Sequence, residues 1–310
     1  MADLRIGISG WSYGPWRRGF YPRGLAPKDE LRFASRAFGS IEINASFYAL
    51  QTPERYALWH EQAPDGFVFS VKAPRFVTHV RRLRDVRKPL ANFFASGLFR
   101  LREKLGPILW QLPPGFRFDP AQLETFLALL PHDNEAALAL AREHDPRLDE
   151  QSHLQIDRRR PLRHALEVRH ESFLVPALVE LLRAHEVALV VADSAGKWPW
   201  CEDLCSDFVY LRLHGDTELY ASGYGDEALD FWSRRIRAWS RGGQPQDARL
   251  ILPQQPPPAL PERDVYCYFD NTAKTHAPFD AARLLRLLGL ERGLLPAAGA
   301  RPCNPPGVAA

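Results

Sequence analysis

The sequence predicts an α/β protein with a single domain, a closed (β/α)8 TIM barrel, and three observations support this. Eight short runs of β-branched and apolar residues recur along the chain, and segments with helical spacing lie between most of them. Strands that alternate with helices pair in parallel through right-handed crossovers, and eight such units close into a barrel. The chain has 310 residues, 45% of them hydrophobic, which is enough for one large core.

The expected strands are short and recur along the whole chain. They cover residues 4–10, 40–46, 67–73, 106–112, 164–169, 187–193, 208–215 and 264–270. Helical patterns are clearest at residues 119–130, 176–186, 228–240 and 278–290. In the first of these helices, Asp119 suits the N-cap and Pro120 suits the first helical position.

An open, doubly wound sheet is the alternative fold. Such a sheet normally carries a glycine-rich loop with the pattern G-x-G-x-x-G after its first strand, where it binds phosphate. The segment GISGWSYGPW has glycines at Gly7, Gly10 and Gly14, and their spacing does not match that pattern. We therefore favour the closed barrel and assign it to residues 1–292.

Two segments depart from the repeat of strands and helices. Residues 131–160 are charged and helix-like, and we expect them to form a helical insertion after the fourth strand. Residues 293–310 are rich in proline, glycine and alanine, so we expect a mobile tail there.

The composition bears on location and partners. Charged residues make up 25% of the chain and the formal net charge is +3, so overall charge gives little attraction for nucleic acid. The N-terminus lacks the pattern of a secretory signal, and no apolar run is long enough to cross a bilayer. The four cysteines show no zinc-finger spacing, and we expect reduced thiols. These features predict a cytoplasmic protein without a membrane partner.

Polar side chains gather at the C-terminal ends of the expected strands. Both faces of a barrel strand are covered, so a charged side chain there is expected to point into the lumen near the mouth, where barrel enzymes build their sites. The set comprises Glu42, Asn44, Lys72, Gln111, Glu167, Arg169, Asp193, Arg212, His214, Asp270 and Asn271. The alternative is a self-satisfied lattice of ion pairs that only closes the barrel.

The loops that follow the strands are rich in aromatic residues. Trp11 follows the first strand and Tyr48 the second, and two or three rings facing the mouth would suit a sugar ring or a nucleobase. The densest basic run, Arg81–Lys88, follows the third strand. This run fits a solvated helix face or, alternatively, a rim that contacts phosphate.

A series of motifs in the chain resembles a known family. They are IGISGWSYGPWRRGFYP, FGSIEINASFYAL, FVFSVKAPRFVTH, LGPILWQLPP, ALEVRHESF, ADS, DFVYLRLHG and VYCYFDN, followed by HAPFDA. From about residue 4 to residue 285, the chain resembles the YecE-like family, also called domain of unknown function 72. The resemblance implies a TIM barrel and no particular reaction. The chain departs from the family pattern at residues 131–160 and at FDNTAKTHAP, where members tend to have a shorter, asparagine-rich turn.

The first functional hypothesis is a metal-independent enzyme. Its ligand would be a small molecule that is anionic or contains a ring, such as a sugar, a nucleotide or a phosphate compound. Glu167 would act as general acid or base, and His214 or His79 would shuttle a proton. Lys72 and Arg212 would hold the anion. Lys72 is also a catalytic candidate, as is Asp270.

Two other hypotheses remain open. A divalent-metal enzyme, such as an isomerase or a phosphodiesterase, could use Glu167, Asp193 and His214, which lie at the ends of three successive strands. A non-catalytic protein could bind nucleic acid or a nucleotide through Arg81–Lys88 and stacking aromatic rings. The residues identify no cofactor.

Overall fold

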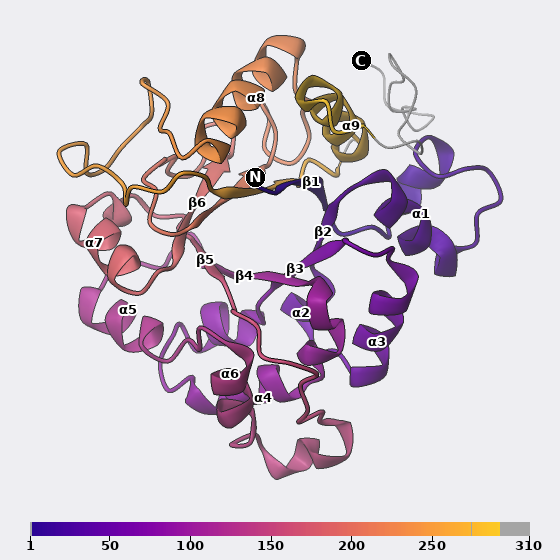
Figure 1. Ribbon diagram of the computed structural model, residues 1–310, viewed down its shortest axis with the longest axis vertical. Helices are drawn as coiled ribbons and strands as arrows, with labels where there is room; N and C mark the ends of the chain where they lie inside the picture. The colour runs from indigo at the N-terminus through magenta and orange to yellow at the C-terminus, as the bar shows by residue number, and fades with distance from the viewer. Residues whose placement is uncertain (1, 274, 292–310) are drawn as a thin grey trace.

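The computed structural model describes residues 2–273 and 275–291. Within them, eight parallel strands close into a barrel in chain order, which confirms the predicted fold (Figure 1). The strands are β1 (Leu4–Ser9), β2 (Ser40–Ile43), β3 (Val68–Lys72), β4 (Leu105–Gln111), β5 (His164–Glu167), β6 (Ala188–Asp193), β7 (Phe208–Leu213) and β8 (Asp264–Phe269).

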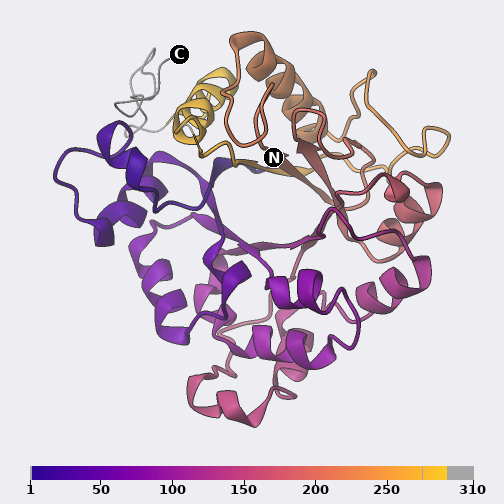
Figure 2. The same cartoon turned by 180° about the vertical axis from the view of Figure 1, so that it is seen from behind.

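Helices form a ring around the strands, seen from the two ends of the barrel in Figures 1 and 2. They are α1 (Glu30–Ala37), α2 (Ala45–Tyr48), α3 (Pro53–Gln62), α4 (Arg87–Ala95), α5 (Pro120–Leu127), α6 (Asn134–Ala141), α7 (Pro176–Ala184), α8 (Asp226–Ser240) and α9 (Ala277–Leu288). In the described part of the chain, none of them is both long enough and apolar enough to cross a membrane.

The start of α5 shows how local chemistry sets an element. Asp119 accepts a hydrogen bond from the backbone N–H of Gln122 at 3.1 Å, and Pro120 takes the first helical position. A side-chain acceptor at the N-cap satisfies a donor that the helix itself cannot. The predicted cap is confirmed.

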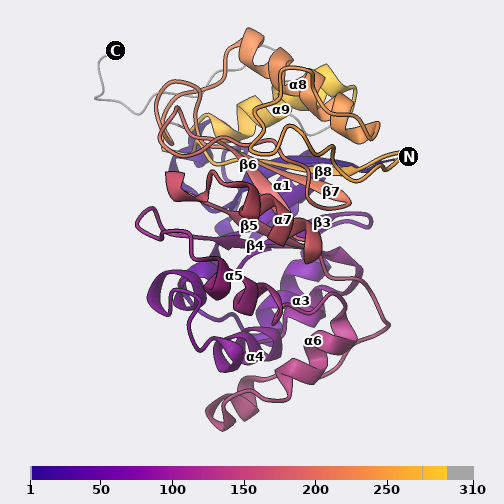
Figure 3. The ribbon, with the colours of Figure 1, turned by 90° about the vertical axis from the view of Figure 1, so that its left-hand side faces the viewer.

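The segment 131–160 is partly helical. It contains α6 and a 3-10 helix at Pro146–Gln151, and α6 packs against α4 on the outside of the ring (Figure 3). Asn134 ties the segment together, because its side chain bonds the backbone of Arg158 and of Arg160 at 2.8 and 2.9 Å. That the segment is an insertion relative to the family remains a prediction. The tail predicted at residues 293–310 lies outside the described residues.

Alternate residues of each strand face the lumen and the helices. Ile6 and Ile8 of β1 belong to the large core under the helices, whereas Ser9 points toward the lumen residue Glu42. Deeper in the lumen, apolar and tyrosine side chains pack together; they are Leu109, Ala165, Ala188, Val190, Ala192, Phe208, Tyr210, Tyr266 and Tyr268. The lumen is thus a packed core below the polar mouth.

One glycine allows a close approach between neighbouring strands. A Cβ atom on Gly7 of β1 would lie 1.8 Å from the carbonyl oxygen of Ser40 on β2. Real Cβ atoms do not approach a carbonyl so closely, so a larger residue at this position would push the two strands apart.

Three strands, β2, β5 and β7, end two or three residues earlier than expected. β2 ends at Ile43, and Asn44 has helical backbone angles before α2, so Ser46 does not belong to the strand. β5 ends at Glu167, which leaves Arg169 beyond the strand, and β7 ends before His214. The chain turns at these points to enter the loops of the barrel mouth.

Candidate active site

Arg212 stands at the centre of the polar mouth. It lies on β7 and is fully buried. Its Nε and Nη2 donate to the two oxygens of Glu42 at 3.0 and 2.8 Å, and its Nη1 donates to Glu167 Oε2 at 2.7 Å. Nη2 also donates to Asp270 Oδ2 at 3.0 Å. Carboxylates from three parts of the barrel thus share one guanidinium, and we call these four residues the Arg212 cluster.

Neutral side chains complete the hydrogen bonding of the cluster. Tyr210 Oη and Ser9 Oγ donate to Glu42 at 2.7 and 2.6 Å. Asn44 Nδ2 donates to Ser9 Oγ at 2.8 Å, and Gln111 Nε2 lies 3.1 and 3.2 Å from the two oxygens of Glu167. A buried ion pair is favourable only when the carboxylate oxygens also accept further hydrogen bonds. The contacts above provide these bonds for Glu42 and Glu167.

A second guanidinium lies above the cluster. Arg169 Nε donates to Glu167 Oε1 at 2.6 Å, and the guanidinium stacks 3.6 Å from the centre of the Trp198 ring. Its Nη2 is buried and has no hydrogen-bond partner among the described residues. Because a buried charged donor without an acceptor is costly, this atom is a candidate contact for a ligand.

His214 also has unsatisfied ring nitrogens. It is fully buried, with Trp198 and Tyr220 packed edge-on at 5.4 Å. Nδ1 lies 3.2 Å from Asp270 Oδ2, but this contact is not aligned as a hydrogen bond, and Nε2 likewise has no partner in the described part of the chain. Burial and then the charge of Arg212 lower the pKa of His214, so the imidazole is neutral at neutral pH.

Lys72 brings a third basic group to the mouth. It is the last residue of β3 and is buried, with its ammonium 4.3 Å from the centre of the Phe47 ring. Burial and then the charge of Arg212 lower its pKa to about 8, although Glu42, Asp270 and Glu167 oppose the shift. The ammonium has no hydrogen-bond acceptor among the described residues, apart from the ring face.

His79 adjoins Lys72 on the loop after β3. It lies in a single π-helical turn, Phe76–Val80, with its ring edge-on to Phe47 at 5.0 Å. Its Nδ1 is 2.9 Å from Thr78 Oγ1. Burial, followed by the charges of Lys72 and Arg169, lowers its pKa to about 4, so this imidazole is neutral as well.

Two acids of the mouth, Glu167 and Asp270, remain ionised. Burial alone would raise the pKa of Glu167, but Arg169 and Arg212 outweigh it and hold that pKa well below the usual value. The same opposition, led by Arg212, keeps the pKa of Asp270 far below its ordinary range. Neither carboxyl group can donate a proton near neutral pH, because neither carries one.

Asp193 does not join the Arg212 cluster. Val190 and Ala192 of β6 face the lumen, so Asp193 faces the helices, where it lines a separate pocket with Trp200 and Trp232. Burial raises its pKa to about 6. The trio Glu167, Asp193 and His214 therefore does not assemble, and no group of three potential metal ligands comes together anywhere in residues 2–273 and 275–291.

Three other predicted residues lie apart from the cluster. Trp11 packs edge-on against Trp59 of α3 at 5.3 Å, as part of the outer core. Asn271 donates to Asp280 Oδ2 and to the backbone of Ser222, so it joins α9 to the loop after β7. Tyr48 is exposed and lines a pocket beside Phe47.

The prediction that Arg81–Lys88 forms a helix face is wrong for most of the run. Arg82, Leu83 and Asp85 have positive φ angles, and α4 begins only at Arg87. Arg82 donates to the backbone of Gly115, Arg81 pairs with Asp85, and Arg87 pairs with Glu143. Most of this positive charge is engaged within the protein.

Some residues of the site were not among the candidates for the polar mouth. Ser9 ends β1 in the same lumen phase as Gly7, and strand alternation alone would have placed it beside Glu42. Phe47 and Trp198 were visible only as members of the aromatic loops. Their contacts with Lys72 and Arg169 depend on loop conformation, which no sequence spacing encodes.

Comparisons with known proteins agree with this architecture. The family model described as "Protein of unknown function DUF72" matches residues 5–304. The chain is 33% identical over 113 residues to the UPF0759 protein YecE of Escherichia coli (strain K12), which covers 36% of this chain and 39% of YecE. It is 31% identical over 118 residues to the UPF0759 protein YunF of Bacillus subtilis (strain 168), covering 36% of this chain and 41% of YunF. These matches span about two fifths of each relative's length.

Solved structures share the fold. A DUF72 family protein from Thermotoga maritima MSB8 has a TM-score of 0.69 and 23% identity, over 93% of this chain and 99% of that chain. A DUF72 family protein from Enterococcus faecalis V583 has a TM-score of 0.66 and 14% identity, over 93% and 96% of the two chains. At these identities the likeness concerns the fold alone. The family model spans nearly the whole chain, and this protein therefore belongs to the DUF72 family.

Proposed function

We propose that this protein is an enzyme that transfers a proton on a small anionic substrate bound at the barrel mouth, with Lys72 as the acid–base group. A general acid or base works best when its pKa lies near the working pH, and the pKa of Lys72 is lowered to about 8. The proposed substrate is a small molecule that carries a phosphate or a carboxylate group.

One observation carries the proposal: buried polar atoms at the mouth lack hydrogen-bond partners. Nη2 of Arg169 and the ring nitrogens of His214 have no hydrogen-bond partner in the described residues. A lattice that only closed the barrel would satisfy its own members, as Glu42 and Glu167 are satisfied. An anion between Arg169, His214 and Lys72 would supply the missing acceptor.

Glu167 takes a different role in this proposal. Its pKa lies well below the usual value, so it is a very weak base and cannot be an acid at neutral pH. It instead holds Arg169 and Arg212 in place through ion pairs of 2.6 and 2.7 Å. The sequence suggested Glu167 for proton transfer, and we assign this role to Lys72 instead. Within the described residues, the Lys72 ammonium donates no hydrogen bond to a protein group.

Inorganic phosphate is the simplest probe of the site. We expect phosphate to bind to the purified protein in calorimetry, and Lys72→Met to weaken that binding at least about tenfold, since a charge-assisted contact is lost. Lys28→Met is the control, because Lys28 is exposed and lies outside the mouth. Equal binding by the parent and Lys72→Met proteins, or no binding of phosphate and simple carboxylates, would contradict the proposal.

A further inference from the structure

We infer that the substrate carries an apolar group of about the size of one ring beside its anionic group, and that a pocket next to Phe47 receives it. This inference rests on the proposed function, because it names the class of compound that the same site takes. The compounds are aryl or short branched alkyl phosphates or carboxylates.

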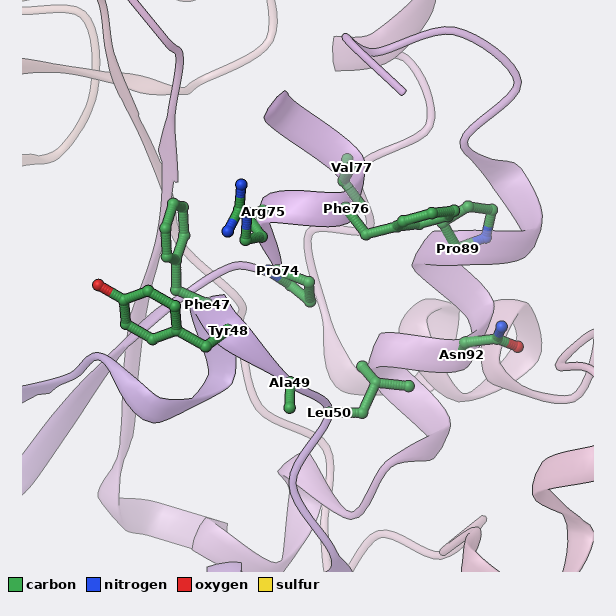
Figure 4. A pocket seen from close by; sticks show the side chains of 10 residues that line it. All are labelled: Phe47, Tyr48, Ala49, Leu50, Pro74, Arg75, Phe76, Val77, Pro89 and Asn92. Carbon is green, nitrogen blue, oxygen red and sulfur yellow. The ribbon is translucent and has the colours of Figure 1, made fainter. Parts of the chain in front are cut away.

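The pocket lies where the loops after β2 and β3 meet α4. Figure 4 shows Phe47 and Tyr48 on one side and Leu50 and Phe76 on the other, with Pro74 between them. Its cavity volume is about 130 Å³. A cavity of roughly 150 Å³ lined by apolar side chains accepts benzene, so a pocket of this size suits a single ring or a branched alkyl group.

The walls of the pocket expose apolar surface to water. Tyr48, Phe76 and Leu50 are 72%, 50% and 38% exposed. They are three of the seven large hydrophobic side chains that are exposed in the described part of the chain, and all three line this one pocket. Clustering of exposed apolar side chains around a concave surface is typical of a binding site and uncommon elsewhere on a soluble protein.

Phe47 connects the pocket to the proposed anion site. The Lys72 ammonium is 4.3 Å from the centre of the Phe47 ring, and the His79 ring lies edge-on to Phe47 at 5.0 Å. The same phenylalanine lines the apolar pocket. A ligand whose anionic group contacts Lys72 can therefore place an attached ring in the pocket by passing over a single side chain.

The charge around the pocket agrees with an anionic ligand. Of its ten lining residues in the described chain, Arg75 alone is charged, and it is positive (Figure 4). With Lys72, whose ammonium contacts the lining residue Phe47, it places positive charge at the pocket. A cationic group would be repelled by these side chains, whereas a ligand with an anionic group and an apolar group is matched by the basic side chains and by the apolar pocket.

Paired probes separate the ring from the anion. We expect phenyl phosphate to bind about tenfold more tightly than inorganic phosphate, which corresponds to removing roughly 60 Å² of apolar surface from water. Phenylacetate against acetate makes the same comparison for a carboxylate. The comparison of inorganic phosphate with acetate identifies which anion the site prefers.

Substitutions then locate the effect. Phe76→Ala should remove most of the tenfold advantage of phenyl phosphate and leave the binding of inorganic phosphate unchanged, because Phe76 is half exposed and lies away from the anion site. Leu287→Ala, at an exposed position on α9, is the matched control and should change neither. Lys72→Met should weaken both probes together.

The outcomes distinguish the two proposals. If phosphate and phenyl phosphate bind equally, or if Phe76→Ala leaves the ring advantage intact, the apolar pocket does not receive the substrate while the anion site stands. If neither probe nor either carboxylate binds, the proposed function and this inference both fail.

Discussion

At the residue scale, the surroundings of Glu167 favour a structural role for this residue over the catalytic role that the sequence suggested. It is fully buried and takes part in ion pairs with Arg169 and Arg212. Without it, Arg169 would lose its carboxylate partner among the described residues and Arg212 would lose one of its three, and a buried charge that loses its partner is strongly destabilising. The ion pairs around Glu167 therefore explain why a charged residue occupies a position in a strand.

The substitution Glu167→Gln tests this role. We expect a loss of about 3–5 kcal/mol in the free energy of unfolding, measured with urea, because the arginines stay charged and buried. Glu143→Gln is the control: Glu143 pairs with Arg87 at the surface, where such a pair adds little to stability. Unchanged stability in Glu167→Gln would mean that the carboxylate is free for chemistry after all.

Asp193 shows where reasoning by position alone failed. It ends a strand, as predicted. Neighbouring residues of a strand face opposite sides, however, and because Ala192 faces the lumen, the side chain of Asp193 faces the helices. In contrast, Arg169 reaches Glu167 even though the strand ends between them. Strand ends could be predicted to within a few residues only. Whether the last side chain points into the lumen or toward the helices depends on where the strand ends.

A pH-dependent stability is expected from Asp193. Burial raises its pKa from 3.8 to about 6, so the folded state binds this proton more tightly than the unfolded state, and folding stability falls as pH rises from about 4 to 6. The variant Asp193→Asn has no carboxyl group at this position and should not lose stability in this way. Relative to the parent, the variant should gain roughly 2–3 kcal/mol between pH 4 and pH 8 in urea unfolding. A difference between the two proteins that does not vary with pH would contradict the assignment.

At the scale of elements, helix starts were more predictable than loops. Asp119 and Pro120 marked the first turn of α5 because capping chemistry is local. The turn before α4 could not be predicted in the same way. Arg82, Leu83 and Asp85 adopt positive φ angles, which are uncommon for residues other than glycine, and no local sequence signal predicts them.

The cap of α5 gives a prediction at this scale. Asp119→Ala should lower the free energy of unfolding by about 1 kcal/mol, because the N–H of Gln122 loses its acceptor. Asp119→Asn keeps an acceptor oxygen and should lose much less. A loss of the same size in both variants would show that the charge of Asp119, and not its capping bond, stabilises the helix.

At the scale of the whole molecule, the barrel could be predicted because strand and helix periodicities alternate along the entire chain. The convergence of Glu42, Glu167, Arg212 and Asp270 followed from the fold, since parallel strands end at one mouth. The apolar pocket beside Phe47 could not be predicted. It arises from two loops and a helix whose relative placement depends on packing and leaves no periodic signal.

The whole molecule also explains why Lys72 is unusual. The barrel buries its ammonium beside the positive charge of Arg212, and both effects favour the neutral amine. The three carboxylates that could offset this are already shared with the arginines. An incoming anion would favour the charged ammonium and therefore raise the pKa of Lys72.

The most direct test is an NMR titration of isotopically labelled lysines, of which the chain has six. We predict that one lysine, assigned to Lys72 by its loss in Lys72→Met, titrates with a pKa of about 8 rather than 10.5, and that phosphate raises this value. A Lys72 signal that titrates near 10.5 and does not respond to phosphate or to a carboxylate would contradict the account.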